Sequence, residues 1–123
     1  MLYSLRVTNT GTTAADNNST VITDPIPANT ELFVGDLGGV GSGPVAFVQG
    51  TPTSALTWTF TSLASTTDDV SFSNGDCVTF NYVPPTGVNY DPAIKCIRLN
   101  PKGTLASASG NPFFELRFRV RIK

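Results

Sequence analysis

Hydrophobic and polar side chains alternate with a period of two along most of the chain. Because successive side chains of a strand point to opposite faces, this alternation predicts strands with one face in the core and one in solvent. Residues 3–8 and 56–61 show the pattern, and no segment shows the i, i+3, i+4, i+7 spacing of an amphipathic helix. The clearest strand is at the C-terminal end, where charged residues separate Phe114, Leu116, Phe118, Val120 and Ile122.

A hairpin is predicted around the Asn-Gly dipeptide that follows Ser73. A two-residue turn there would place the apolar residues of its two strands on different faces. A three-residue loop, 74–76, instead pairs Phe72 with Val78 and Val70 with Phe80 on one face, so we expect the longer loop. The residues that then point away from the core are Ser71, Ser73, Cys77, Thr79 and Asn81.

Further strands are expected at 20–24, 31–35, 45–48 and 94–99, and the glycine-rich run 35–43 is expected to be a mobile loop. Eight or nine short strands with frequent turn signals are typical of an immunoglobulin-like, two-sheet antiparallel β-sandwich. The length of 123 residues suits one domain with one core. We therefore predict a single β-sandwich domain over residues 1–123.

The composition narrows the chemistry, because the chain contains no histidine. Nucleophile pairs that depend on histidine, histidine-ligated zinc and histidine proton shuttles are excluded. Seven acids and one base fall in residues 1–76, whereas two acids and seven bases fall in 77–123. Such a split indicates either two binding faces or acidic and basic strands that interleave in one sandwich. The net charge of −1 gives no general attraction to nucleic acid, which we do not expect as a partner.

Targeting signals are absent from the sequence, which has neither a secretory leader nor an apolar stretch of membrane-spanning length. Direct membrane insertion is therefore not expected. Strand-like patterning reaches almost to both ends, whereas natural chains usually fray there. This suggests a fragment of a longer polypeptide, whose neighbouring domains would be its first partners.

The opening stretch carries a resemblance to a known family. Tyr3, Asn9-Thr10-Gly11 and Thr23-Asp24-Pro25-Ile26-Pro27, followed by Thr30 and Phe33, resemble a conserved repeat of bacterial surface proteins that is catalogued as a domain of unknown function. The later run from FSNG to FELRFRVRIK resembles the C-terminal unit of some exported proteins of this kind, from which the two cysteines depart. The resemblance implies an immunoglobulin-like fold, a secreted or cell-surface location and a structural or adhesive role without catalytic residues.

Candidate chemistry is sparse. Calcium could be held by Asp68, Asp69, Asp76 and Asp91, although their spacing fits no calcium loop and exposed turn carboxylates explain them as well. Cys77 and Cys96 are expected on similar outward faces, so they could form a disulfide if their strands are neighbours, or remain two free thiols in a cytosolic protein.

The last strand carries a basic ladder on one face, a candidate binding surface for a polyanion. Aromatic residues do not interleave with these bases on that face, so base stacking is not offered. An edge strand guarded by charge, or a strand beside an acidic neighbour, also explains the ladder. Trp58 and Phe60 could form a sugar platform, but their alternation with threonine favours core packing. The ladder consists of Arg117, Arg119, Arg121 and Lys123.

Together these features predict a non-catalytic scaffold module of a bacterial surface or secreted protein, without cofactor. The alternative is an adhesion module that binds a surface protein or a glycan through the glycine-rich loop or the basic strand. A carboxylate-based hydrolase is a third reading, and it would require a pocket that holds two close acids.

Overall fold

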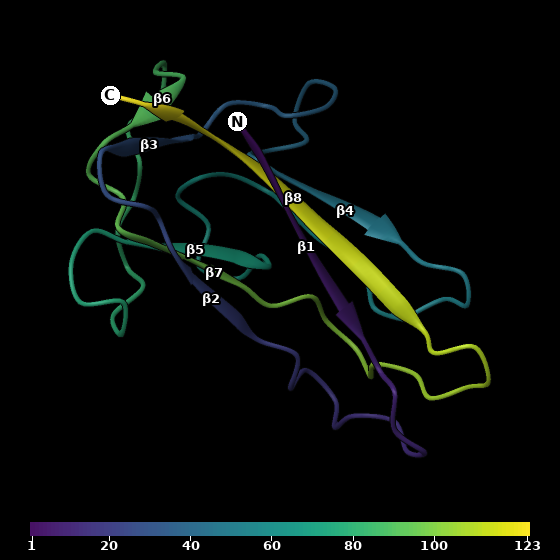
Figure 1. Cartoon of the computed structure of the whole chain (residues 1–123). Coiled ribbons are helices and arrows are strands. Elements are labelled where there is room, and N and C mark those ends of the chain that lie inside the picture. The colour runs from purple at the N-terminus through teal and green to yellow at the C-terminus, as the bar shows by residue number, and fades with distance from the viewer.

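The computed structural model describes residues 1–123 and contains eight strands and no helix. The strands form two antiparallel sheets, of five and three strands, which pack into a β-sandwich (Figure 1). The all-β, two-sheet prediction is confirmed, and immunoglobulin-like connectivity stays a prediction. The strands are β1 (Leu2–Thr8), β2 (Ile22–Pro25), β3 (Thr30–Phe33), β4 (Val45–Gln49), β5 (Val70–Ser73), β6 (Tyr90–Asp91), β7 (Cys96–Leu99) and β8 (Phe113–Ile122).

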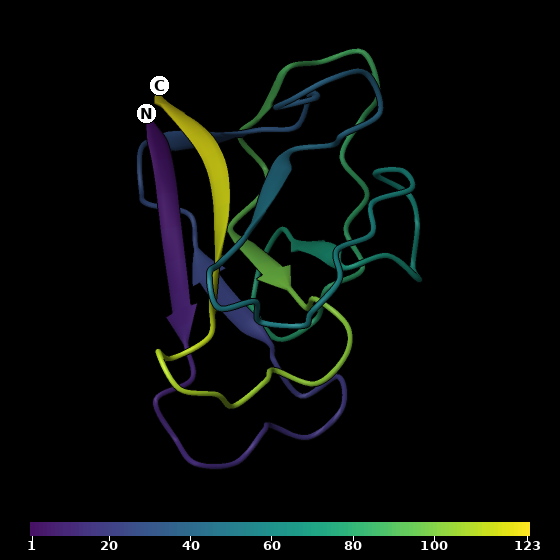
Figure 2. The ribbon, with the colours of Figure 1, turned by 90° about the vertical axis from the view of Figure 1, so that its right-hand side faces the viewer.

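The ten-residue strand β8 organises the larger sheet. One of its edges pairs with β1, from Leu2 opposite Arg119 to Thr8 opposite Phe113. Its other edge pairs with β4 in its first half and with β3 near its end, and β6 extends the sheet beyond β3. Figure 2 shows β1 and β8 side by side, with the two chain termini at the same end. β8 is therefore the central strand of this sheet.

The apolar face of β8 forms one wall of the core, as its alternation predicts. Phe114, Leu116, Phe118 and Val120 are at most 1% exposed and pack against the buried side chains of β5 and β7. Ile122, expected on the same face, is 71% exposed because it lies past the last buried residue of the strand. The alternation identifies the face correctly but not the point at which the core ends.

The smaller sheet has the order β2-β7-β5, and each of its strands has four residues. The four additional strands expected from the sequence are confirmed within a few residues, as β2, β3, β4 and β7. β2 ends at Pro25, as expected for a residue that lacks a backbone donor. The run 35–43 is a loop, in which the Asp36 carboxylate accepts hydrogen bonds from the amides of Gly41 and Gly43.

The predicted hairpin after Ser73 is wrong. Phe72 pairs with Tyr82 in an isolated bridge, and Val78 is 78% exposed instead of facing Phe72. Two side chains accept hydrogen bonds from backbone amides that a hairpin would use for strand pairing. Asp76 accepts from Val78 and Thr79, and Ser73 Oγ accepts from Gly75 and Cys77. Local side-chain bonds of this kind compete with strand pairing, so the chain loops out before it returns.

The strand expected at 56–61 does not form, although side chains in this segment do alternate between buried and exposed positions. Leu56 is buried and Trp58 is half-buried, but the only pairing is an isolated bridge between Thr57 and Lys102. Pro101, which precedes that partner, has no amide hydrogen with which to continue a ladder. The segment is therefore extended and packed against the core without being part of a sheet.

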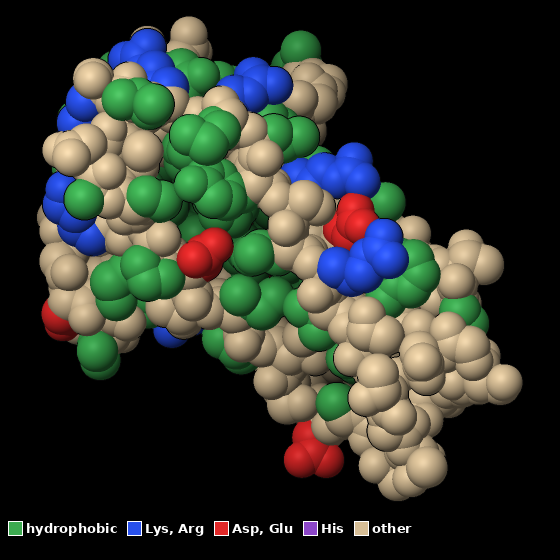
Figure 3. All heavy atoms as spheres, in the orientation of Figure 1, with side chains coloured by type: hydrophobic (Ala, Val, Ile, Leu, Met, Phe, Trp, Pro, Cys, Tyr) green, Lys and Arg blue, Asp and Glu red, His purple; other side chains and the backbone are tan.

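Strands β1 and β2 are the free edges of the two sheets on one side of the sandwich (Figures 1 and 2). Half-buried side chains line the seam between them, and Figure 3 shows hydrophobic atoms at the surface there. Asp24 lies opposite Ile97 on the inward face of β2, and burial raises the pKa of its carboxyl above the ordinary value. The half-buried residues of the seam are Tyr3, Leu5, Val7, Ile22 and Ile26.

Candidate functional site

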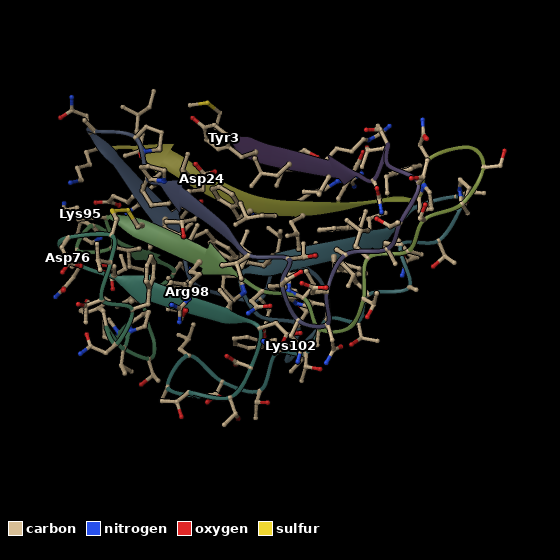
Figure 4. The ribbon with its side chains drawn as sticks, turned by 90° about the horizontal axis from the view of Figure 1, so that it is seen from below. Tyr3, Asp24, Asp76, Lys95, Arg98 and Lys102 are labelled. Atoms are coloured by element: carbon tan, nitrogen blue, oxygen red, sulfur yellow. A yellow bond between two sulfur atoms is a disulfide. The ribbon has the colours of Figure 1, made fainter.

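Cys77 and Cys96 are joined by a disulfide, with their Cα atoms 5.4 Å apart. β5 and β7 are neighbours, and Ser73 lies opposite Cys96 in their register. The loop after Ser73 folds back over the outer face of the smaller sheet, where it covers Cys96 completely. Figure 4 shows the bond near Asp76 and Lys95. The covalent link thus fixes the segment in which the predicted hairpin fails to form.

The four candidate calcium ligands do not converge. Asp69 is buried, with its carboxylate 3.3 Å from Lys102 Nζ and accepting the amide of Thr59. Asp91 is also buried and accepts from the Tyr82 hydroxyl. No group of three or more His, Cys, Asp or Glu residues is arranged to hold a metal ion. The other two candidates, Asp68 and Asp76, bind backbone amides of separate loops.

Carboxylates serve mainly to hold loops and strand faces together. The backbone amides of Thr79 and Val78 lower the pKa of Asp76, and those of Gly41 and Gly43 lower the pKa of Asp36. Hydrogen bonds from Arg117 and Arg6 lower the pKa of Glu115 in the same way. All three groups are therefore held as charged acceptors in the folded chain.

The basic ladder lies on the outer face of the five-stranded sheet. β8 is a central strand, so the reading of an edge strand guarded by charge is wrong. The reading of an acidic neighbour is supported, because Arg121 bonds Glu31 of β3 at 2.8 Å. Arg117 bonds Glu115 at 2.7 Å, whereas Arg119 has no acidic partner. The ladder is therefore only partly neutralised.

Aromatic rings from other strands lie on this same face, although none interleaves with the bases within β8 itself. Phe33 and Tyr90 form an edge-on pair with centroids 5.3 Å apart. The guanidinium of Arg119 lies 5.3 Å from the Phe33 ring, and that of Arg121 lies 4.1 Å from the Tyr90 ring. The rings come from β3 and β6, so no pattern within the last strand reveals them. We call Phe33, Tyr90, Arg117, Arg119 and Arg121 the arginine-aromatic face.

Trp58 packs in the core, as its alternation favours, and does not form a surface platform. Its ring is parallel to that of Phe47 at 6.4 Å, and Phe47 stacks in turn on Phe114 at 5.5 Å. Phe60 is half-buried beside Gly43, where a Cβ would meet the Phe60 ring at 2.5 Å. The two aromatic residues therefore serve packing and the close approach of the glycine-rich loop.

Three of the four ion pairs join the acidic and basic parts of the sequence: Arg6 with Glu115, Lys102 with Asp69 and Arg121 with Glu31. The charge split thus reflects interleaved segments, the second of the two readings. Figure 3 shows Lys or Arg side chains next to Asp or Glu side chains on the visible face.

The surface has two hollows, and each is lined by one acid. One, of about 430 Å³, is open and lies between the glycine-rich loop and residues 86–89, with Asp36 in its wall. The other, of about 150 Å³, lies on the outer side of the smaller sheet, with Asp68 in its wall. Two close acids, which a carboxylate hydrolase would need, are not found together in either hollow.

Comparison of the chain with family models, with curated proteins and with solved structures finds no match. The resemblance to the bacterial surface-protein repeat therefore stays a prediction. No helix in the structure could cross a membrane.

Proposed function

We propose that this chain is a structural module of an exported bacterial protein, which holds a fixed shape beside its neighbouring domains and resists proteolysis. The observation that carries the proposal is the disulfide between Cys77 and Cys96, which links the irregular segment after β5 to β7. Disulfides persist in oxidising compartments and are rare in the cytosol of mesophiles, so the bond favours a secreted or surface location.

The way the loops are fastened supports the same role. Asp36, Asp68, Asp69, Asp76 and Asp91 each accept at least one backbone amide, so the acids contribute to the shape of the loops. The chain termini lie at the same end of the sandwich (Figure 2), and the Met1 nitrogen donates to the Val120 carbonyl at 2.7 Å. A module joined through adjacent ends would project sideways from its parent rather than extend a line of domains.

Limited proteolysis tests this proposal. The oxidised chain should resist thermolysin under native conditions, because cleavage requires local opening of the backbone. After reduction, cleavage should begin between Cys77 and Cys96, the segment that the disulfide closes. Rapid cleavage of the oxidised chain in that segment would contradict a shape-keeping role.

A second candidate function is adhesion through the arginine-aromatic face. The observation that favours it is Arg119, which packs on Phe33 but has no acidic partner and so keeps its positive charge available to an anionic glycan. An array that includes sulfated glycans is the direct test. Binding that is lost in R119Q but kept in K95Q, a matched change at an exposed lysine elsewhere, would establish adhesion, whereas no binding above background favours the module without a ligand.

A further inference from the structure

The loop that connects β1 and β2, residues 9–21, carries a sequence pattern that neither proposed role uses. Residues 16–20 are Asp-Asn-Asn-Ser-Thr, so Asn17 and Asn18 each stand two positions before a hydroxyl side chain. Asn-x-Ser/Thr without proline in the middle is the acceptor sequence for N-linked glycans in exported proteins. Because so short a motif also occurs by chance, its structural context decides whether it can serve as an acceptor.

Both asparagines lie at the tip of an exposed turn. The Ser19 amide donates to the Asp16 carbonyl at 3.2 Å, which closes the turn. All four residues from Asp16 to Ser19 are exposed to solvent. Asn18 has a φ of 58°, in the left-handed region that asparagine adopts more readily than most residues. A bulky hydrophilic group can therefore be attached here without displacing side chains of the core.

The side-chain amide of Asn18 is held by its oxygen and free at its nitrogen. Oδ1 accepts the Gly103 amide at 2.8 Å, and the backbone amide of Asn18 donates to the Gly103 carbonyl at 2.7 Å. Nδ2 forms no hydrogen bond within the chain. An N-linked glycan replaces one hydrogen of Nδ2 and leaves Oδ1 an acceptor. The turn can therefore keep its anchor to Gly103 when a glycan is attached.

The neighbouring residues favour Asn18 over Asn17 as the acceptor. Thr20, which completes the Asn18 motif, has a hydroxyl without a hydrogen bond in the chain, and a transferase can therefore bind it. Ser19, which completes the Asn17 motif, already donates its hydroxyl to the Asp16 carbonyl at 2.7 Å. Bacterial oligosaccharyltransferases also select an acidic residue two positions before the asparagine. Asp16 stands there for Asn18, whereas Asn17 has an alanine at that position.

The loop lies at the end of the sandwich opposite both chain termini (Figures 1 and 2). A module joined to its parent through those termini would present this turn at its free end, away from the neighbouring domains. A transferase and the attached glycan would therefore meet no obstruction from the parent chain.

We propose that Asn18 is the acceptor of an N-linked glycan that is transferred from an oligosaccharide on a lipid diphosphate. Nδ2 forms a bond to the anomeric carbon of the first sugar, and the bond from that carbon to the diphosphate oxygen breaks. The electron pair of the broken bond stays with the lipid diphosphate, which takes up the proton that Nδ2 loses. The proposal rests on the exported location proposed above, because this transfer takes place outside the cytosol.

Transfer to the purified, oxidised chain in vitro tests the proposal. The chain is incubated with a bacterial oligosaccharyltransferase and its lipid-diphosphate oligosaccharide, and the mass of the intact protein is measured. The folded parent should gain the mass of one oligosaccharide, and peptide fragmentation should locate it on Asn18. Because the assay contains no cell, a negative result counts against the acceptor site and not against export. The limited proteolysis described above tests the shape-keeping role separately.

Matched variants separate the two asparagines without changing either. T20A removes the hydroxyl from the Asn18 motif alone, and S19A removes it from the Asn17 motif alone. T20A should abolish the added mass, T20S should retain it, and S19A should leave it unchanged. D16N keeps the backbone carbonyl that closes the turn and should also lose the added mass. The melting temperature of each variant reports whether it folds.

Three results would overturn the proposal. The first is a folded parent that gains no mass, and modification of a synthetic peptide of residues 13–23 in the same assay would then show that folding closes the site. The second is transfer that persists in T20A and is lost in S19A, which would assign the glycan to Asn17. The third is transfer that persists in both variants.

Discussion

The two sheets of this sandwich are held together by different means. The larger sheet is built on a ten-residue strand that pairs along both edges, with seven residue pairs to β1 and five to β4. Its definition comes from continuous backbone pairing and a strictly alternating apolar face. The smaller sheet consists of three strands of four residues each, which offer few ladder bonds.

The smaller sheet and its loops gain their definition from side chains and a covalent bond. Cys77 is bonded to Cys96, Asp69 binds Lys102 and the Thr59 amide, and Asp76 accepts the amides of Val78 and Thr79. Short strands leave much of the connecting backbone without ladder partners, so other groups must satisfy and fix it. The comparison indicates that side-chain hydrogen bonds, ion pairs and the disulfide fix the backbone in the regions where strand pairing is missing.

Truncation of the β8 core should have the largest effect. Leu116 is fully buried between the sheets, so Leu116→Ala should lower the free energy of unfolding by about 3–5 kcal/mol, through lost burial and the cavity left behind. Urea denaturation followed by circular dichroism measures it. Val48→Ala, on the exposed face of β4, is the control and should cost less than about 0.5 kcal/mol. Similar losses for both variants would show that β8 is not the centre of stability.

Loss of the disulfide should come next. The bond spans a sequence separation of 19, for which loop-closure entropy gives about 3 kcal/mol of stabilisation. Denaturation of the chain with and without reductant, and of the C77S/C96S double variant, should agree on this loss. If reduction leaves the midpoint unchanged, the smaller sheet does not depend on its covalent link.

Removal of the Asp69 carboxylate should have an intermediate effect. Asp69→Ala leaves the Thr59 amide and the Lys102 ammonium group without their buried acceptor, which should cost about 1–3 kcal/mol. Asp69→Asn retains an oxygen for Thr59 and should cost less. Equal losses for both variants would mean that the ion pair with Lys102, not the amide bond, supplies the stabilisation.

Acidification should have the smallest effect of these changes. The free energy of unfolding should change little near neutral pH and should fall further as the pH is lowered. Backbone amides hold the pKa of Asp36 and of Asp76 below 3.8, the ordinary value, so the unfolded chain binds protons more readily than the folded chain. Their contribution is complete above pH 3.8 and is lost as the pH falls through the folded pKa of each group. Denaturation midpoints from pH 7 to pH 2 should fall less steeply in D76N than in the parent.

Asp24 provides a contrast of opposite sign. Burial raises its pKa above 3.8, so it disfavours folding once the pH exceeds the folded pKa. D24N should therefore be more stable than the parent at pH 7 and lose that advantage in acid. A D24N variant that is less stable at pH 7 would mean that the Asp24 carboxylate has a stabilising partner in solution.

The sequence predicts the larger sheet better than the smaller one. The reason is again that the larger sheet is built from alternating strands, whereas the smaller sheet depends on side-chain contacts. Alternation reports half-exposed strands directly, so the buried faces of β1 and β8 are readable from residue types. The failure of the predicted hairpin after Ser73 cannot be read from residue types in this way, because Asp76 and Ser73 bind amides that an ideal hairpin would pair. Local alternation says nothing about this competition.

The candidate sites were even less accessible to sequence reasoning. The stacking of Arg119 on Phe33 depends on the pairing of β3 with β8, which are far apart in the chain. The one available signal for this contact was Phe33 itself, an aromatic residue at a half-exposed strand position, where a cation on a neighbouring strand is a common partner. The acceptor motif at Asn18 can be read from the sequence, but the exposed turn that presents it, anchored by Gly103, cannot.

Amide hydrogen exchange with and without reductant tests most directly the claim that the two sheets are held by different means. On reduction, amides of β5, β7 and residues 74–89 should exchange faster, while those of β1 and β8 keep their protection. Equal loss of protection in β8, or unchanged protection in β5 and β7, would contradict the account.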